Sequence, residues 1–99
     1  MKFLIWLSSE CSSLSEVISA LQSQGNEVGV LLIQDGVFLT DKGCPHSQDM
    51  IDLKVPMFAL KAHLEERGII DRMVGSAKIV EYPEIVDLMM DQYDKVISM

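Results

Sequence analysis

A run of aliphatic residues that stops abruptly at a turn constrains the fold more than any other part of this chain. Residues 28–36 read VGVLLIQDG, so the apolar run ends at Gln34-Asp35-Gly36. A short run of β-branched and aliphatic residues beside a turn is typical of a strand buried on both faces, and such strands belong to parallel sheets covered by helices. The pattern predicts an α/β protein with Asp35 and Gly36 at the carboxyl edge of its sheet, where α/β proteins place their sites.

Strand and helix signals alternate along the rest of the chain. Short apolar stretches predict strands over residues 1–7, 28–33, 55–60, 78–80 and 95–98. Amphipathic stretches predict helices over residues 14–21 and 61–67, a helical turn over 47–53, and a last helix from Pro83 with apolar positions Ile85, Val86, Leu88 and Met89. Ser13 and Glu16 form a capping-box pattern, and Gly68 stands where a left-handed C-cap is expected. This alternation predicts a single α/β domain over residues 1–99 with a mainly parallel sheet.

The composition suggests that another subunit covers part of the surface. The chain has 99 residues, 48% of them hydrophobic and seven of them Met, and its mean hydropathy is +0.23. A domain of this size buries only about 60–70% of its unfolded surface, so its margin of stability is small. For a soluble monomer of this size, the hydrophobic content is high. We therefore expect a partner subunit on an apolar patch, with a dense α/β core as the alternative.

The charge pattern excludes direct contact with nucleic acid. The formal net charge is −7 with a sequence pI near 4.6, and the eight Lys and Arg residues are scattered along the chain. Binding to DNA or RNA requires clustered cations that neutralise phosphates and release counterions. An acidic surface suits a basic protein partner, although acidity is also a general feature of soluble proteins.

The amino-terminal apolar run is expected to be a strand and not a targeting segment. It is too short for a signal peptide, lacks a small-residue cleavage site, and passes directly into Ser8-Ser9-Glu10. No apolar segment approaches the length that spans a bilayer. We therefore expect a cytoplasmic protein without membrane contact, in which Cys11 and Cys44 stay thiols.

Three blocks of sequence carry a resemblance to a known family. They are residues 30–38 (VLLIQDGVF), residues 57–69 (MFALK leading to LEERGI), and residues 79–88 (IVEY followed by IVDL). In order and spacing, over nearly the whole chain, they are similar to the DsrE/DsrF/DsrH superfamily, and specifically to its DsrH/TusB branch of small sulfur-relay proteins. The resemblance implies a three-layer α/β/α domain with a five-stranded, mainly parallel sheet.

The resemblance also implies a function and partners. Members pass persulfide sulfur between carrier proteins, toward 2-thiouridine in tRNA or within dissimilatory sulfur oxidation. They assemble as homodimers or with DsrE/TusD-like and DsrF/TusC-like subunits. The sulfur-carrying cysteine of the DsrE/TusD branch follows the third strand, where this chain has Lys61-Ala62-His63, and a cysteine in the first helix of some DsrH-like members falls near Val17. Neither cysteine is transferred here, which fits a subunit that binds relay proteins without carrying sulfur.

Each of the two cysteines nevertheless stands where a thiol can be reactive. Cys11 precedes a Ser-capped helix, whose unpaired N–H groups favour a thiolate, although Glu10 and Glu16 oppose this effect. Cys44 lies in an irregular segment with His46 two positions away, and an imidazolium stabilises a thiolate. For both, the alternative is an inert small residue. Because both follow strands at the same edge of a parallel sheet, they can approach each other.

The remaining polar groups give weaker signals. Asp35 is expected to cap the turn by accepting backbone N–H bonds while Gly36 supplies backbone freedom, with a catalytic carboxylate as the alternative. No phosphate-binding glycine pattern is present, so no nucleotide cofactor is expected. Zinc sites usually contain a close ligand pair such as C-x-x-C, and no such pair occurs among Cys11, Cys44, His46 and His63.

Two functional hypotheses remain. The favoured one is a DsrH/TusB-like partner subunit that binds other sulfur-relay proteins. The other is a small, stand-alone thiol sulfurtransferase in which Cys11 or Cys44 accepts the persulfide sulfur.

Overall fold

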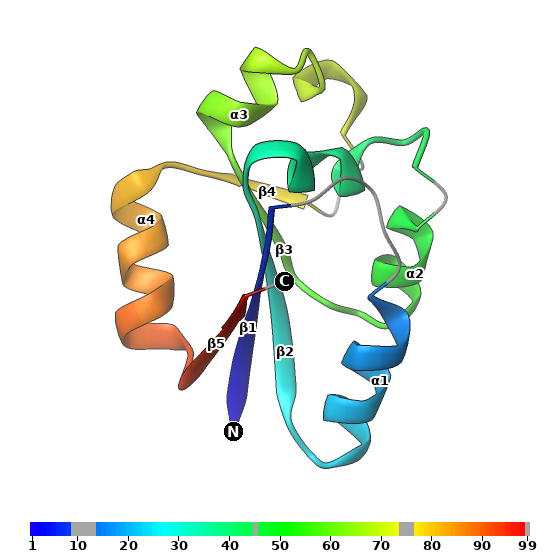
Figure 1. The fold of residues 1–99 in the computed structure, drawn as a ribbon, viewed down its shortest axis with the longest axis vertical. Coiled ribbons are helices and arrows are strands. Elements are labelled where there is room, and N and C mark those ends of the chain that lie inside the picture. Colours follow the sequence, from blue (N-terminus) through cyan, green and yellow to red (C-terminus); the bar gives the residue numbers. More distant parts are fainter. Residues whose placement is uncertain (9–13, 45, 74–76, 99) are drawn as a thin grey trace.

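Parallel strands form a central sheet with helices on both of its faces (Figure 1). The computed structural model describes residues 1–8, 14–44, 46–73 and 77–98. Within these ranges the elements follow one another as β1 (Lys2–Leu7), α1 (Ser15–Ser23), β2 (Glu27–Leu32), η1 (Gln34–Thr40), α2 (Ser47–Asp52), β3 (Met57–Leu60), α3 (Lys61–Glu66), η2 (Ile70–Arg72), β4 (Ala77–Val80), α4 (Tyr82–Asp87), η3 (Leu88–Gln92) and β5 (Lys95–Ser98).

The sheet has five strands in the described residues, in the order β4-β3-β2-β1-β5, and every neighbouring pair is parallel. In the central strand β2 all residues except Glu27 are buried. Continuous burial is what helices on both faces impose on an inner parallel strand. The predicted α/β class, the five-stranded parallel sheet and the buried strand near residues 28–33 are therefore confirmed.

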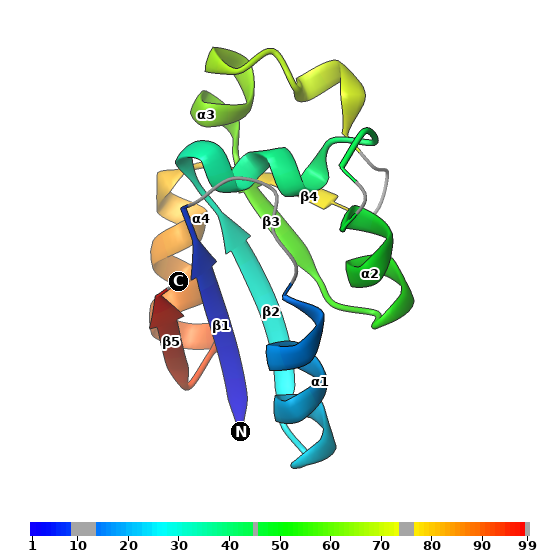
Figure 2. The same ribbon diagram turned by 45° about the vertical axis from the view of Figure 1, so that its right-hand side comes forward.

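The two faces of the sheet are covered unequally. One face carries α1 and α2, whereas α4 with η3 lies on the other face (Figures 1 and 2). The larger apolar cluster lies on the α1 and α2 side and includes Ile18, Val30 and Met50. The smaller cluster lies under α4 and includes Leu4, Leu31, Leu60, Val80, Ile85 and Leu88. The side of α4 that faces away from the sheet therefore lies at the surface of the molecule.

Helix boundaries follow the predicted signals in most places. Gly68 has a φ angle of +65°, the left-handed conformation expected after α3, and Gly25 after α1 has a φ angle of +86°. At the start of α4 the side chains of Glu81 and Glu84 form a capping box, and Pro83 occupies the first turn. The capping residue predicted at Ser13 lies outside the described residues, and Leu14 precedes α1 without a side-chain cap bond.

The last helix continues beyond its α-helical part. After Asp87 the chain forms the π-helical turn η3, which ends at Gln92 before β5 begins. Because the turn directly extends α4, residues 82–92 form one helical rod over the second face of the sheet (Figure 1). Among the residues that the structure describes, no helix is long and apolar enough to cross a membrane.

Candidate functional site at the carboxyl edge of the sheet

The turn η1 crosses the end of β1 in close contact with its backbone. The N–H of Ile33 donates to the carbonyl oxygen of Leu7 at 3.1 Å, and the N–H of Gly36 donates to the carbonyl oxygen of Ile33 at 2.8 Å. A Cβ atom on Gly36 would collide with the Leu7 carbonyl oxygen. Glycine is required here because only a residue without a side chain lets the two backbones approach this closely.

Gln34 links this turn to the helix that follows β3. Its φ angle is +49°, a conformation that residues other than glycine rarely adopt. In this conformation its N–H donates to Nδ1 of His63 at 2.6 Å. A ring nitrogen that accepts a hydrogen bond carries no proton, so this bond assigns the neutral His63 tautomer with its proton on Nε2. His63 is partly exposed at the sheet edge.

A second bond joins the same two elements. The Nε of Arg67 donates to Oδ1 of Asp35 at 2.9 Å. No side-chain capping bond at this turn occurs among the described residues, and Asp35 accepts from Arg67 instead. The guanidinium is the better partner because a charge-assisted bond is stronger than one to a neutral N–H. The backbone N–H of Gln34 and the carboxylate of Asp35 therefore tether η1 to His63 of α3 and to Arg67 at the end of that helix.

Cys44 differs from the expected free thiol. It is buried, with 7% of its surface exposed, and takes part in a disulfide bond. The described residues accordingly contain no free cysteine. Cys11, the chain's other cysteine, lies outside the described residues. His46, expected to support a thiolate, has its Nδ1 at 3.4 Å from Oδ2 of Asp49, so a carboxylate neighbours its imidazole.

The edge after β3 offers polar groups of several kinds. The ammonium of Lys61 lies 3.9 Å from the carboxylate of Glu65. The same segment of chain carries the imidazole of His63 and the guanidinium of Arg67. These groups donate and accept hydrogen bonds, and none of them is a sulfur nucleophile. In the described part of the chain no group of three or more potential ligands gathers to hold a metal ion. The sequence did not reveal the roles of Gln34 and Arg67, because no local signal marks their contacts. Gln34 and His63 are 29 residues apart, and Asp35 and Arg67 are 32 residues apart.

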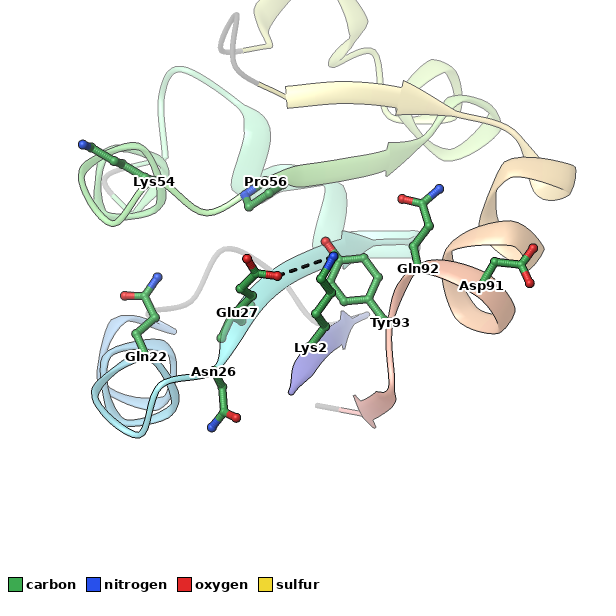
Figure 3. Close-up of a pocket in the computed structure, with 10 residues that line it drawn as sticks. Lys2, Gln22, Asn26, Glu27, Lys54, Pro56, Asp91, Gln92 and Tyr93 are labelled. Atoms are coloured by element: carbon green, nitrogen blue, oxygen red, sulfur yellow. Dashed lines mark ion pairs between the residues drawn. The ribbon is translucent and has the colours of Figure 1, made fainter.

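A pocket of about 580 Å³ lies at the opposite edge, where the strands begin (Figure 3). Its charged side chains are of both signs, and Lys2 pairs with Glu27 at 3.5 Å within it. The ring of Tyr93 packs against Gly29, and burial together with the carboxylate of Glu27 raises the pKa of the Tyr93 phenol. The charged side chains that line this pocket are two lysines, Lys2 and Lys54, and two carboxylates, Glu27 and Asp91.

The strand order and the layers of helices identify the fold class of this protein. A five-stranded parallel sheet between helices, in the order β4-β3-β2-β1-β5, is a three-layer α/β/α fold. Two solved structures share it. The protein of unknown function MTH1491 from Methanobacterium thermoautotrophicum has a TM-score of 0.79 and 16% identity, over 99% of this chain and 98% of its own. The ychN protein from E. coli has a TM-score of 0.78 and 16% identity, over 100% of both chains.

Sequence comparison then gives the family. The profile described as DsrH like protein matches residues 8–96, and the chain belongs to this family. Protein TusB of Photorhabdus laumondii is 29% identical over 79 residues, covering 80% of this chain and 81% of that protein. Protein TusB of Pectobacterium carotovorum is 31% identical over 62 residues, or 63% and 65% of the two chains. The predicted resemblance to the DsrH/TusB branch is confirmed, and with it membership of a family of sulfur-relay subunits.

Proposed function

We propose that this protein is a partner subunit of a sulfur-relay system, which binds persulfide-carrying proteins without carrying the sulfur itself. One observation carries the proposal. Directly after β3 the chain presents Lys61, Ala62 and His63, and the His63 imidazole is already bonded to the backbone of Gln34. A sulfur carrier needs an accessible thiolate, and the described residues provide no free thiol at this edge.

The proposed partners are proteins, in keeping with the acidic surface. They are DsrE/TusD-like and DsrF/TusC-like subunits or sulfur carriers, with a second copy of the chain as the alternative. The proposed location is the cytoplasm, and the proposed pathway leads to 2-thiouridine in tRNA or belongs to dissimilatory sulfur oxidation. The net charge of −7 supports contact with the protein components of either pathway and not with the RNA.

Co-expression with companion subunits tests this function. The chain is produced together with a TusC-like and a TusD-like subunit from the same organism, and the complex is sized in solution. We expect all three chains to elute together, and the complex to accept sulfur on the TusD-like cysteine. A chain that stays monomeric and binds neither subunit would contradict the proposal.

The alternative function makes Cys44 or Cys11 the carrier, after a thiol reductant has opened the disulfide of Cys44. The thiolate would attack the outer sulfur of a donor persulfide, the donor's S–S bond would break, and the donor would leave as a thiolate. The attacking cysteine would keep the transferred sulfur as its own persulfide. The buried position of Cys44 speaks against this role, because the attack requires access to the donor.

Intact-mass measurement distinguishes the two functions. The reduced protein is incubated with a persulfide donor and compared with Cys11→Ser and Cys44→Ser. The partner-subunit proposal expects no cysteine-dependent gain of one sulfur. A gain that disappears in one of the two variants would establish that cysteine as the carrier.

A further inference from the structure

A row of exposed apolar side chains runs along the outer side of α4 and η3. Tyr82, Val86 and Met90 are 63%, 57% and 76% exposed. Their spacing of four residues places them on one face of the helical rod, whereas Ile85 and Leu88 point to the sheet and are buried. We call Tyr82, Val86 and Met90 the apolar row.

This part of the chain holds most of the exposed apolar surface. The large apolar side chains exposed in the described residues are Met1, Ile51, Ile79, Tyr82, Val86, Met90 and Val96. Four of these seven lie between residues 79 and 90. Exposed apolar residues that stand singly need no explanation, but a row of them along one helix is typical of a protein-binding surface.

Carboxylates lie beside the apolar row on the same helical rod. Glu84, Asp87 and Asp91 are exposed, and helical spacing places them together on the other side of the exposed surface. We call them the acidic row. Residues 81–94 contain five carboxylates and no Lys or Arg.

The acidic row is not neutralised within the described chain. The ion pairs found among the described residues involve none of its members. Lys78 lines the groove between β4 and α4 together with Glu84 and Asp87 but forms no ion pair with them in these ranges. In Figure 1 α4 stands alone on its side of the sheet.

We propose that the outer side of α4 and η3 is the docking surface for a basic protein. The apolar row enters an apolar groove of that partner, and Lys or Arg side chains at the rim of the groove meet the acidic row. A helix that lays one face into a groove is a common mode of recognition, and complementary charge selects its partner. The inference rests on the proposed function in that the basic protein is a component of the sulfur relay.

Charge disfavours a second copy of the chain as the occupant. A symmetric contact through this surface would bring two apolar rows together and place two acidic rows near each other. The chain's own eight Lys and Arg are scattered and are outnumbered by 15 carboxylates. A partner with clustered cations avoids this repulsion.

Site-specific photo-crosslinking in cells of the source organism tests the surface. A photoreactive residue is placed at Val86 or at Met90 in the full chain, with Ile51 as the control. Ile51 is also an exposed aliphatic residue, at 38%, but it lies on α2 and on the opposite face of the sheet. We expect a covalent adduct from positions 86 and 90 and none from position 51, with the crosslinked partner peptide rich in Lys or Arg.

Charge reversal supplies the second readout. The double variant Asp87→Lys, Asp91→Lys should lower the crosslink yield from position 86 by about tenfold or more. In this variant two lysines would face the cations of the partner, where the wild type presents two carboxylates. Glu16→Lys, an exposed charge reversal on α1, should leave the yield unchanged. The thermal midpoint of each variant is measured to establish folding, and Asp87→Asn, Asp91→Asn replaces the lysine variant if that variant unfolds.

The outcomes separate this inference from the proposed function. An adduct to a second copy of the chain or to an acidic peptide, an equal yield from position 51, or no adduct from positions 86 and 90 would overturn the docking surface. If a basic protein is captured that takes no part in sulfur transfer, the surface stands and the proposed function fails. If relay subunits bind the chain without crosslinking to α4 or η3, the proposed function stands and the surface fails.

Discussion

The N–H of Gln34 donates a 2.6 Å hydrogen bond to Nδ1 of His63, and this bond joins the turn after β2 to the helix after β3. Gln34 has a φ angle of +49°, in the left-handed region. The side chain at the position after the third strand therefore bonds the backbone of a residue in an uncommon conformation. Its role at this edge is structural.

Removing the His63 acceptor should destabilise the protein. His63→Ala leaves the Gln34 N–H without its partner, and we expect a loss of about 0.5–1.5 kcal/mol in the free energy of unfolding. His63→Asn is the matched control, because the side-chain oxygen of Asn can take the position of Nδ1 and should retain most of the stability. Denaturant unfolding measures both variants. Equal losses in the two would contradict a role for the hydrogen bond.

The contact of Gly36 with Leu7 should not tolerate a methyl group. In Gly36→Ala the new Cβ would collide with the Leu7 carbonyl oxygen, a backbone atom that cannot rotate away. We expect a destabilisation of about 1–3 kcal/mol or more. Gly43→Ala is the control, because there the nearest atom, Oδ1 of Asp41, is 3.5 Å from the added Cβ. That variant should stay within about 0.5 kcal/mol of the wild type in thermal or denaturant unfolding.

Gly29 and Tyr93 should be energetically coupled. A Cβ on Gly29 would collide with the Tyr93 hydroxyl oxygen and lie 2.7 Å from the ring carbon that bears it. Gly29→Ala should therefore destabilise the wild type, and the same change should cost less in a Tyr93→Ala background. A double-mutant cycle by denaturant unfolding should give a coupling of about 0.5–3 kcal/mol. If the effects of the two substitutions are additive, the Tyr93 ring does not restrict the space at Gly29.

The Tyr93 phenol should make stability depend on alkaline pH. Burial and, to a smaller extent, the Glu27 carboxylate raise its pKa in the folded protein. The stabilising contribution is therefore complete below the unfolded pKa of about 10 and is lost as the pH rises through the folded pKa. The free energy of unfolding should fall more steeply above this pH in the wild type than in Tyr93→Phe.

Absorbance measures the same titration directly. In Tyr82→Phe the remaining tyrosine is Tyr93, so phenolate absorbance against pH reports its pKa alone. The midpoint should lie above that of a free tyrosine. A midpoint at or below the ordinary value would contradict the buried environment.

Local patterns predicted the elements of this fold, because each element is encoded by residues close together in the sequence. The continuous apolar run produced β2, and Gly68 follows its helix in the left-handed conformation as expected. The last helix shows the limit of such patterns. Ile85 and Val86 were both expected on its apolar side, yet Ile85 is buried and Val86 is exposed, because the sheet packs on one side of the helix only.

The candidate site was less predictable, because its contacts join distant residues. Asp35 was placed correctly at the sheet edge, but its partner Arg67 is 32 residues away and carries no local signal. The positive φ angle of Gln34, which occurs together with its bond to His63, is not marked by its residue type. The disulfide of Cys44 was likewise not expected, since its formation depends on the fold and on redox conditions together.

The order of the strands has a consequence for aggregation and for assembly. The two edges of the sheet are the four-residue strands β4 and β5, and each carries an exposed lysine, Lys78 or Lys95. Short, charged edges resist the addition of a strand from another chain, which is the first step of edge-to-edge aggregation. A neighbouring subunit is therefore expected to join this protein through side chains on its helices and turns, leaving each sheet a separate unit within the assembly.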